Sequence, residues 1–133
     1  LFAGSDQLQQ AIVDAMAEAP ASARPIDAVG IGLAAAERFF NSDNRDFSRL
    51  RHRIITANAE LLERELIKLA SLASAIAGAL RRRGVPDPAA SLTAEAGMGV
   101  FRVAFEAWIA DDENWPDLVN RSLAQLKELV AAR

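Results

Sequence analysis

The sequence predicts an all-α protein of about six helices that fold as one domain over residues 1–133. Apolar residues recur at intervals of three and four along the chain, which is the period of an amphipathic helix. No run alternates between apolar and polar residues, as a half-buried strand would. Prolines and glycines separate the periodic segments. A chain of this length buries roughly two thirds of its unfolded surface, which is enough for one core.

The composition is that of a globular protein, with 51% hydrophobic and 25% charged residues. Because there is no cysteine, the chain has no disulfide, no thiol nucleophile and no thiolate metal site. The longest uncharged run, Leu69 to Leu80, is too short for a membrane-spanning helix of about 20 residues. We therefore expect no membrane segment, and a cytoplasmic location because no export signal is visible.

Three helical segments are predicted before residue 57. The first spans about residues 6–19. The second begins at Pro25, a residue that suits the first turn of a helix, and runs to about Phe40. A short third helix over about 46–56 is expected to turn three apolar side chains inward, namely Phe47, Leu50 and Ile54.

The clearest helix follows Asn58, whose side chain can accept a hydrogen bond from the first turn. Its apolar seam repeats at intervals of four and three through Leu62, Leu66, Leu69, Ala73, Ile76 and Leu80. Three arginines at 81–83, followed by Gly84 and Pro86, form a strong helix stop. Asp87 and Pro88 are expected to open the next helix, and Pro116 the last, which runs to about Ala132.

The helix predicted over 87–110 is apolar nearly all the way round. One arc holds mainly small residues: Leu92, Ala96, Gly99, Val100, Val103 and Ala107. The opposite arc holds Met98, Phe101, Phe105, Trp108 and Ile109. A surface helix needs only one apolar stripe of about 100°, so this helix must be covered on two sides. We expect the bulky arc to face the core or a cavity, and the small arc to allow close approach of a helix from a second subunit.

The net charge of −3 is unevenly distributed, since residues 45–83 carry nine basic and four acidic residues. A nucleic-acid surface would have such an excess. We favour a structural interpretation instead. Three arginines in the last turn of a helix interact favourably with its dipole, and the other arginines are distributed around a short helix.

An enzyme would need a set of catalytic groups that this sequence does not supply. His52 is the only histidine, so a di-iron site with Glu-x-x-His pairs on two helices cannot form. No serine lies in a nucleophile elbow, and no glycine-rich loop follows a strand. We therefore predict no enzyme, no catalytic residue, no metal site and no cofactor. Four helical glycines are expected to permit close helix approach: Gly30, Gly32, Gly97 and Gly99.

Aromatic residues occur in three of the predicted helices, where they either fill the core or line a cavity. An apolar cavity with a few polar groups is typical of small-molecule sites in helical bundles. The candidate ligand-binding residues are Phe40, Phe47, His52, Ile55, Phe101, Phe105 and Trp108. The polar candidates nearby are Arg51, Thr56 and Asn58.

The order of these elements resembles the C-terminal effector-binding and dimerisation domain of the TetR family of bacterial transcriptional regulators. The segment LFAGSDQLQQAIVDAM at 1–16 is similar to the linker helix that follows the DNA-binding domain in that family. Over 49–87, a short arginine-rich helix, an Asn-containing kink and a long helix closing on Arg-x-Gly resemble a common subgroup pattern. The segments 95–112 and 115–130 are similar to the terminal helix pair.

The resemblance implies a regulatory domain that binds a small-molecule effector, here apolar or aromatic, and forms a homodimer through its last two helices. It also implies that effector binding shifts helix 6–19 and changes the spacing of two DNA-binding heads, whose half-sites lie about one DNA turn or a multiple apart. The family's helix-turn-helix is missing from this chain. We therefore expect operator DNA to be bound only through that N-terminal domain. The family has no universal effector-contact motif, so no ligand residue carries over.

The candidate dimer-interface residues lie on the two terminal helices: Ala96, Gly99, Val100, Val103, Val119, Leu123 and Leu126. A second class of protein stays open at this point, a structural helical interaction module that binds a protein partner without any effector. An enclosed apolar cavity contacted by Phe40, Phe47 and Phe105 would favour the regulator. A solid core with an open groove would favour the interaction module.

Overall fold

The computed structural model describes residues 3–111 and 113–131, with side chains from Asp6 onward. These residues form six α-helices, one 3-10 helix and no strand, so the predicted all-α class is confirmed. The elements are α1 (Ala3–Glu18), α2 (Pro25–Ala34), η1 (Ala35–Phe39), α3 (Ser42–Thr56), α4 (Ala59–Arg82), α5 (Ala89–Ala110) and α6 (Trp115–Ala131).

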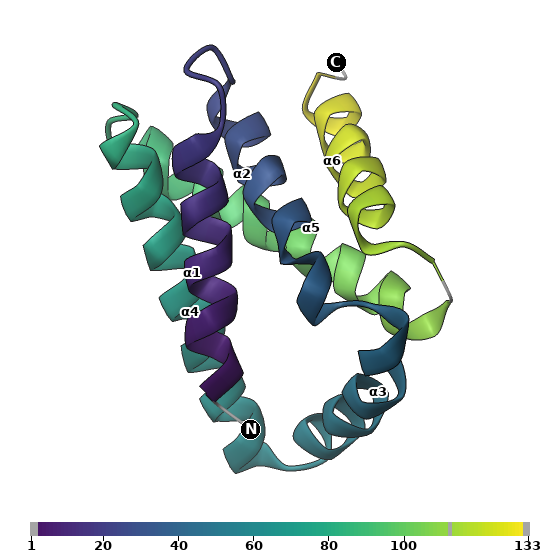
Figure 1. Cartoon of the computed structure of the whole chain (residues 1–133). Helices are drawn as coiled ribbons and strands as arrows, with labels where there is room; N and C mark the ends of the chain where they lie inside the picture. The colour runs from purple at the N-terminus through teal and green to yellow at the C-terminus, as the bar shows by residue number, and fades with distance from the viewer. Residues whose placement is uncertain (1–2, 112, 132–133) are drawn as a thin grey trace.

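Helix α5 is the central element of the bundle. α1 and α4 lie side by side, α2 packs beside α1, and α5 runs behind them (Figure 1). α6 packs on α2 and α5, while α3 contacts α4 and the C-terminal end of α5. α5 therefore contacts four other helices, which explains why its sequence is apolar over so much of its circumference.

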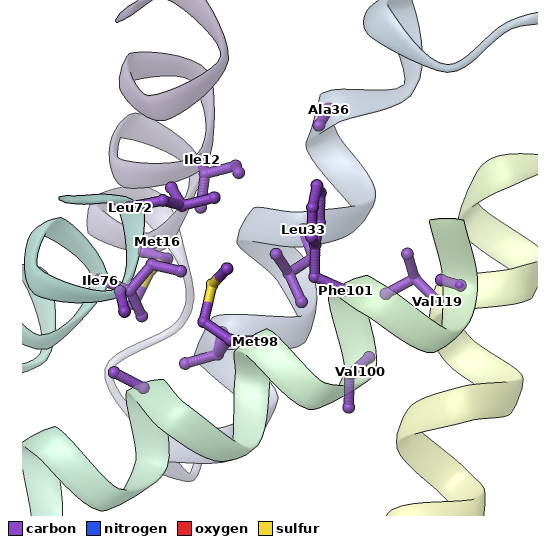
Figure 2. Packing of buried hydrophobic residues seen from close by; sticks show 14 of the residues in the cluster. Ile12, Met16, Leu33, Ala36, Leu72, Ile76, Met98, Val100, Phe101 and Val119 are labelled. Atoms are coloured by element: carbon purple, nitrogen blue, oxygen red, sulfur yellow. The ribbon is translucent and has the colours of Figure 1, made fainter. Parts of the chain in front are cut away.

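The core forms where α1, α2, α4 and α5 meet. Figure 2 shows Met98 pointing from α5 toward the α1–α4 side, where Met16 and Ile76 lie. On α6, Trp115 is buried, and its Nε1–H donates to the Leu33 carbonyl at 2.8 Å. That carbonyl lies near the point where α2 ends and η1 begins, so the indole takes up an acceptor at a helix end.

Three of the four helical glycines permit close helix packing, as predicted. A Cβ atom at Gly32 would lie 2.7 Å from the Met16 Cγ atom and 2.8 Å from the Ile12 carbonyl oxygen. One at Gly97 would lie 2.5 Å from a Val29 methyl carbon. Gly30 meets Leu123 in the same way. Gly99 differs, because a Cβ atom there would meet nothing within 4 Å in the described part of this chain.

Replacing Gly32 by alanine is therefore expected to destabilise the fold by about 1–3 kcal/mol, since overpacked cores lose stability in this range. The backbone oxygen of Ile12 cannot move aside as a flexible side-chain end can. Urea unfolding followed by circular dichroism measures the effect. Gly78→Ala on α4 is the matched control, because its Cβ atom would make only an ordinary contact at 3.6 Å. That variant should be about 0.5–1 kcal/mol more stable than the unmodified chain. Equal stability of the two variants would contradict the close α1–α2 packing.

Several helix ends match the prediction and others move by a few residues. Asn58 caps α4 by accepting the Leu61 N–H at 3.1 Å, and Gly84 ends it with a φ of 93°. α3 begins at Ser42 and not near 46, because Asn41 provides the N-cap. The second helix changes to a 3-10 helix after Ala34 before it reaches Phe40.

Asp87 does not open α5 as predicted, since Pro88 is the residue that precedes the first helical turn. The Asp87 carboxylate instead accepts hydrogen bonds from Arg81 at 2.8 and 3.2 Å. These bonds lower the pKa of the Asp87 carboxyl below its ordinary value. The ion pair joins the end of α4 to the start of α5.

The predicted inward face of α3 is wrong. Phe47, Leu50 and Ile54 are 62%, 48% and 50% exposed, and the buried residues of the helix are Arg45 and Ile55. Arg45 Nε donates to the Trp108 carbonyl at 2.9 Å, and Arg49 Nε donates to the Ile109 carbonyl. These two arginines take the inward face because carbonyls at the C-terminal end of α5 need donors, and cations are favoured there.

A third arginine has the same role at another helix end. Arg83 donates to the carbonyls of Met16, Ala19 and Pro20 at 2.9, 3.0 and 2.7 Å, and so anchors the C-terminal end of α1 to α4. Much of the basic excess of residues 45–83 therefore contacts helix ends and carboxylates inside the fold. This supports the structural interpretation of that excess over a nucleic-acid surface.

Candidate functional site

A cavity of about 520 Å³ lies between α1, η1, α3, α4 and α5. Its volume falls within the range of roughly 300–1,000 Å³ that is usual for small-molecule sites. Most of its apolar lining comes from the C-terminal half of α5, the N-terminal half of α4 and the end of η1. The apolar lining residues are Leu8, Phe39, Phe40, Ile55, Leu62, Leu66, Leu69, Leu72, Phe101 and Phe105.

An aromatic cluster forms one wall of the cavity. The Phe40 ring lies edge-on to the rings of Phe101 and Phe105, at centroid distances of 5.8 and 6.1 Å. From the core side, Trp115 stacks on Phe40 at 4.1 Å and Trp108 meets it edge-on at 5.3 Å. Because both indoles are buried, they hold the phenyl rings in place. The wall is thus formed before any ligand arrives.

Five of the seven predicted ligand-binding residues line this cavity: Phe40, His52, Ile55, Phe101 and Phe105. The other two do not. Phe47 lies on the exposed side of α3, and Trp108 is fully buried behind the aromatic wall. Of the polar candidates, Arg51 and Thr56 line the cavity, whereas Asn58 caps α4.

Helix α4 provides a wall of the cavity that was not predicted from the sequence. Leu62, Leu66 and Leu69 belong to the predicted apolar seam of that helix, and none of them was among the candidate ligand-binding residues. Only the second half of the seam, Ala73, Ile76 and Leu80, is buried in the core. The spacing itself held no signal for this difference, because an apolar seam has the same period whether it faces a core or a cavity.

The polar part of the lining carries charges of both signs. Arg51 on α3 forms two hydrogen bonds to the Glu65 carboxylate on α4, at 3.0 and 3.4 Å. Burial lowers the pKa of the neighbouring Lys68, while the carboxylates of Glu65 and Asp6 oppose that shift. The charged lining residues balance, with Asp6, Glu65 and Glu106 against Arg51, Lys68 and Arg102.

The candidate dimer residues divide between core and surface. Val100, Val119 and Leu123 are buried in the chain's own core, at 3%, 0% and 8% exposure, so they are not open to a second chain. Ala96 and Leu126 are half-buried, and Gly99 and Val103 are exposed. The same two helices carry three further exposed apolar residues, of which Leu92 belongs to the small arc of α5: Leu92, Leu129 and Val130.

The bulky arc of α5 faces inward, as expected, since Met98, Phe101 and Trp108 are buried. Within residues 3–111 and 113–131, no group of three or more His, Asp or Glu side chains is placed to hold a metal ion. In the same part of the chain, no helix is both long enough and apolar enough to cross a membrane.

A bundle of six α-helices, with no strand in the described residues, is the fold expected of a TetR-type C-terminal domain. Comparison with protein families matches residues 23–131 to the family described as the MftR C-terminal domain. The chain belongs to this family of TetR-type C-terminal domains, which confirms the resemblance drawn from the order of its helices. The match covers α2 to α6 and starts after α1. A search of curated proteins finds no match.

Proposed function

We propose that the chain is the regulatory domain of a TetR-like DNA-binding transcriptional regulator, and that its cavity binds a small apolar or aromatic effector. The observation that carries this proposal is the cavity of about 520 Å³ with its preformed aromatic wall. The role is regulatory and not catalytic, and we place it in the cytoplasm. Operator DNA is contacted by the DNA-binding domain of the parent protein and not by these residues.

The position of α1 supports the regulatory part of the proposal. Leu8 and Gln9, near the start of α1, line the cavity, whereas its other end is held by Arg83. An occupant of the cavity therefore contacts the N-terminal half of the helix that resembles the family's linker to DNA. A ligand that binds better to one position of α1 shifts the population toward that position.

The second part of the proposal is a homodimer through α5 and α6. Val103 and Leu92 on α5 are exposed, and Gly99 between them leaves space for a close approach. On α6, Leu129 and Val130 extend the apolar surface toward the end of the helix. Exposed apolar side chains on two helices that pack against each other are the kind of surface that an interface uses.

Filling the cavity with a larger side chain tests the effector site. Leu66 lines the cavity and is partly exposed, so Leu66→Trp should occupy the ligand's space without overpacking the core. We expect this variant to bind the neutral aromatic dye N-phenyl-1-naphthylamine at least about ten-fold more weakly, because the dye loses most of its buried contact area. Fluorescence titration measures the affinity.

Ile67→Trp is the matched control, since Ile67 is the next residue on α4, is exposed and does not line the cavity. Its affinity for the dye should stay within about two-fold of the unmodified chain, because it changes no cavity contact. If both variants lose binding equally, or neither does, the dye binds elsewhere and the cavity is not the effector site.

A further inference from the structure

The charged groups along the cavity offer little to a charged ligand. The positive and negative side chains of the lining are equal in number. Arg51, the best-placed cation on α3, is already held by Glu65 through two hydrogen bonds. A ligand carboxylate would have to displace Glu65 from that pair and leave a partly buried charge without its partner, which is costly. Because the opposite charges are equal in number, the lining as a whole has no net charge to attract a ligand of either sign.

His52 differs from these groups. It lies on α3 one position after Arg51, and its ring meets the Phe105 ring edge-on at a centroid distance of 5.5 Å. It lines the cavity and is half-buried. No hydrogen bond is formed by its ring nitrogens within the part of the chain that the structure describes, and the Thr56 hydroxyl donates to its backbone carbonyl at 2.9 Å. The imidazole is thus a hydrogen-bonding group at the border of the aromatic wall.

We propose that His52 is the specificity-determining residue of the cavity and that the effector is a neutral aromatic compound bearing a hydroxyl or carbonyl group. This inference rests on the proposed function. A neutral imidazole has one donor and one acceptor nitrogen, so it can bond a hydroxyl or a carbonyl without a change of charge. The aromatic body of such a ligand packs against Phe101 and Phe105, while its oxygen meets His52 at their edge.

Ser48 adds a second polar group on the same side. It precedes His52 by four residues on α3 and also lines the cavity, so the two side chains lie on one face of the helix. A hydroxyl or carbonyl oxygen of the ligand would form a hydrogen bond with His52 or Ser48 while the ligand's ring packs on the aromatic wall. Sites that hydrogen-bond a ligand oxygen reject analogues that lack it, because the protein group then stays unpaired.

Three naphthalene probes that differ in one substituent test the inference on the full chain. Naphthalene, 2-naphthol and 2-naphthoate are compared by displacement of N-phenyl-1-naphthylamine. We expect 2-naphthol to bind about 3- to 10-fold more tightly than naphthalene, as one added hydrogen bond gives. 2-Naphthoate should bind more weakly than 2-naphthol. In His52→Leu, 2-naphthol should fall to the affinity of naphthalene, whose own affinity stays within about two-fold.

His52→Gln keeps a donor and an acceptor at the same position and should retain part of the preference for 2-naphthol. Thermal unfolding of both variants checks that they fold. Tightest binding of 2-naphthoate would overturn the inference in favour of recognition by cations. So would an equal loss of naphthalene and 2-naphthol in His52→Leu, which would make His52 a packing residue. If naphthalene binds, but 2-naphthol binds no more tightly than naphthalene in the chain that has His52, only this inference fails. If no probe displaces the dye, the proposed function fails with it.

Discussion

In sedimentation equilibrium at micromolar concentration, the unmodified chain is expected to be a dimer and the Val103→Arg chain a monomer. Val103 is 58% exposed and lies on the small apolar face of α5, next to the open space at Gly99. In a two-fold dimer the substitution appears twice in one interface. Burying an unpaired charge there should weaken association by about 3 kcal/mol or more, which is over about 100-fold.

Ile67→Arg is the control for this experiment. It introduces the same charge on an exposed apolar position of α4, at 62% exposure, away from the two terminal helices. That variant should dimerise as the unmodified chain does, and circular dichroism should show both variants to be folded. A monomeric unmodified chain at micromolar concentration would contradict the proposed dimer, whose interface is expected to bury about 2,000 Å² or more.

The Arg45→Met substitution is expected to destabilise the fold by about 3 kcal/mol, because it leaves buried carbonyls without donors. Arg45 is 6% exposed and donates to the carbonyls of Trp108 and Glu113 at 2.9 and 3.1 Å. Its guanidinium also lies over the Trp108 ring, 5.2 Å from the centroid. Methionine keeps most of the volume but none of the donors.

Urea unfolding measures this loss, best in the Val103→Arg background so that unfolding is not coupled to dissociation. Arg53→Met is the matched control, since Arg53 lies on the same helix and is exposed. It should change stability by less than about 0.5 kcal/mol, as surface substitutions usually do. Equal effects of the two substitutions would mean that Arg45 does not hold α3 to the end of α5.

Local sequence signals predicted the fold well because they act within one helix. The Asn58 cap, the Gly84 stop and the apolar seam of α4 depend on neighbours a few residues away, and the structure has all three. The close approach at Gly32 and Gly97 was predicted in the same way. A glycine destabilises a helix relative to alanine, so its presence there indicates that a neighbouring helix packs closely.

The predictions were wrong where contacts between distant parts of the chain determine which side chains are buried. Apolar spacing placed Phe47 inward on α3, but Arg45 and Arg49 occupy that face because α5 ends there. The sequence around Arg49 does not indicate that the end of α5, 60 residues further along the chain, packs against it. Likewise Trp108 was expected to contact ligand, whereas Phe40 separates it from the cavity.

The aromatic part of the candidate site was predicted from the sequence, whereas the wall formed by α4 was not. Phe40, Phe101 and Phe105 were recognisable because phenylalanine side chains are usually buried, although Phe47 is an exception here. Leu66 was not predicted as a cavity residue, because a leucine in a helical seam has the same spacing whether it faces a core or a cavity. Val119 and Leu123 were predicted as interface residues. They are buried within the chain because α2 packs on this part of α6, with Gly30 against Leu123.

The most direct test of the effector site is a crystal structure of the chain with 6-bromo-2-naphthol, in which the anomalous signal of bromine marks the ligand. We expect one bromine position per chain inside the cavity, with the naphthalene rings against Phe101 and Phe105. Bromine found only on the exposed stripe of α3, at Phe47, Leu50 and Ile54, would contradict the assignment of the cavity as the effector site.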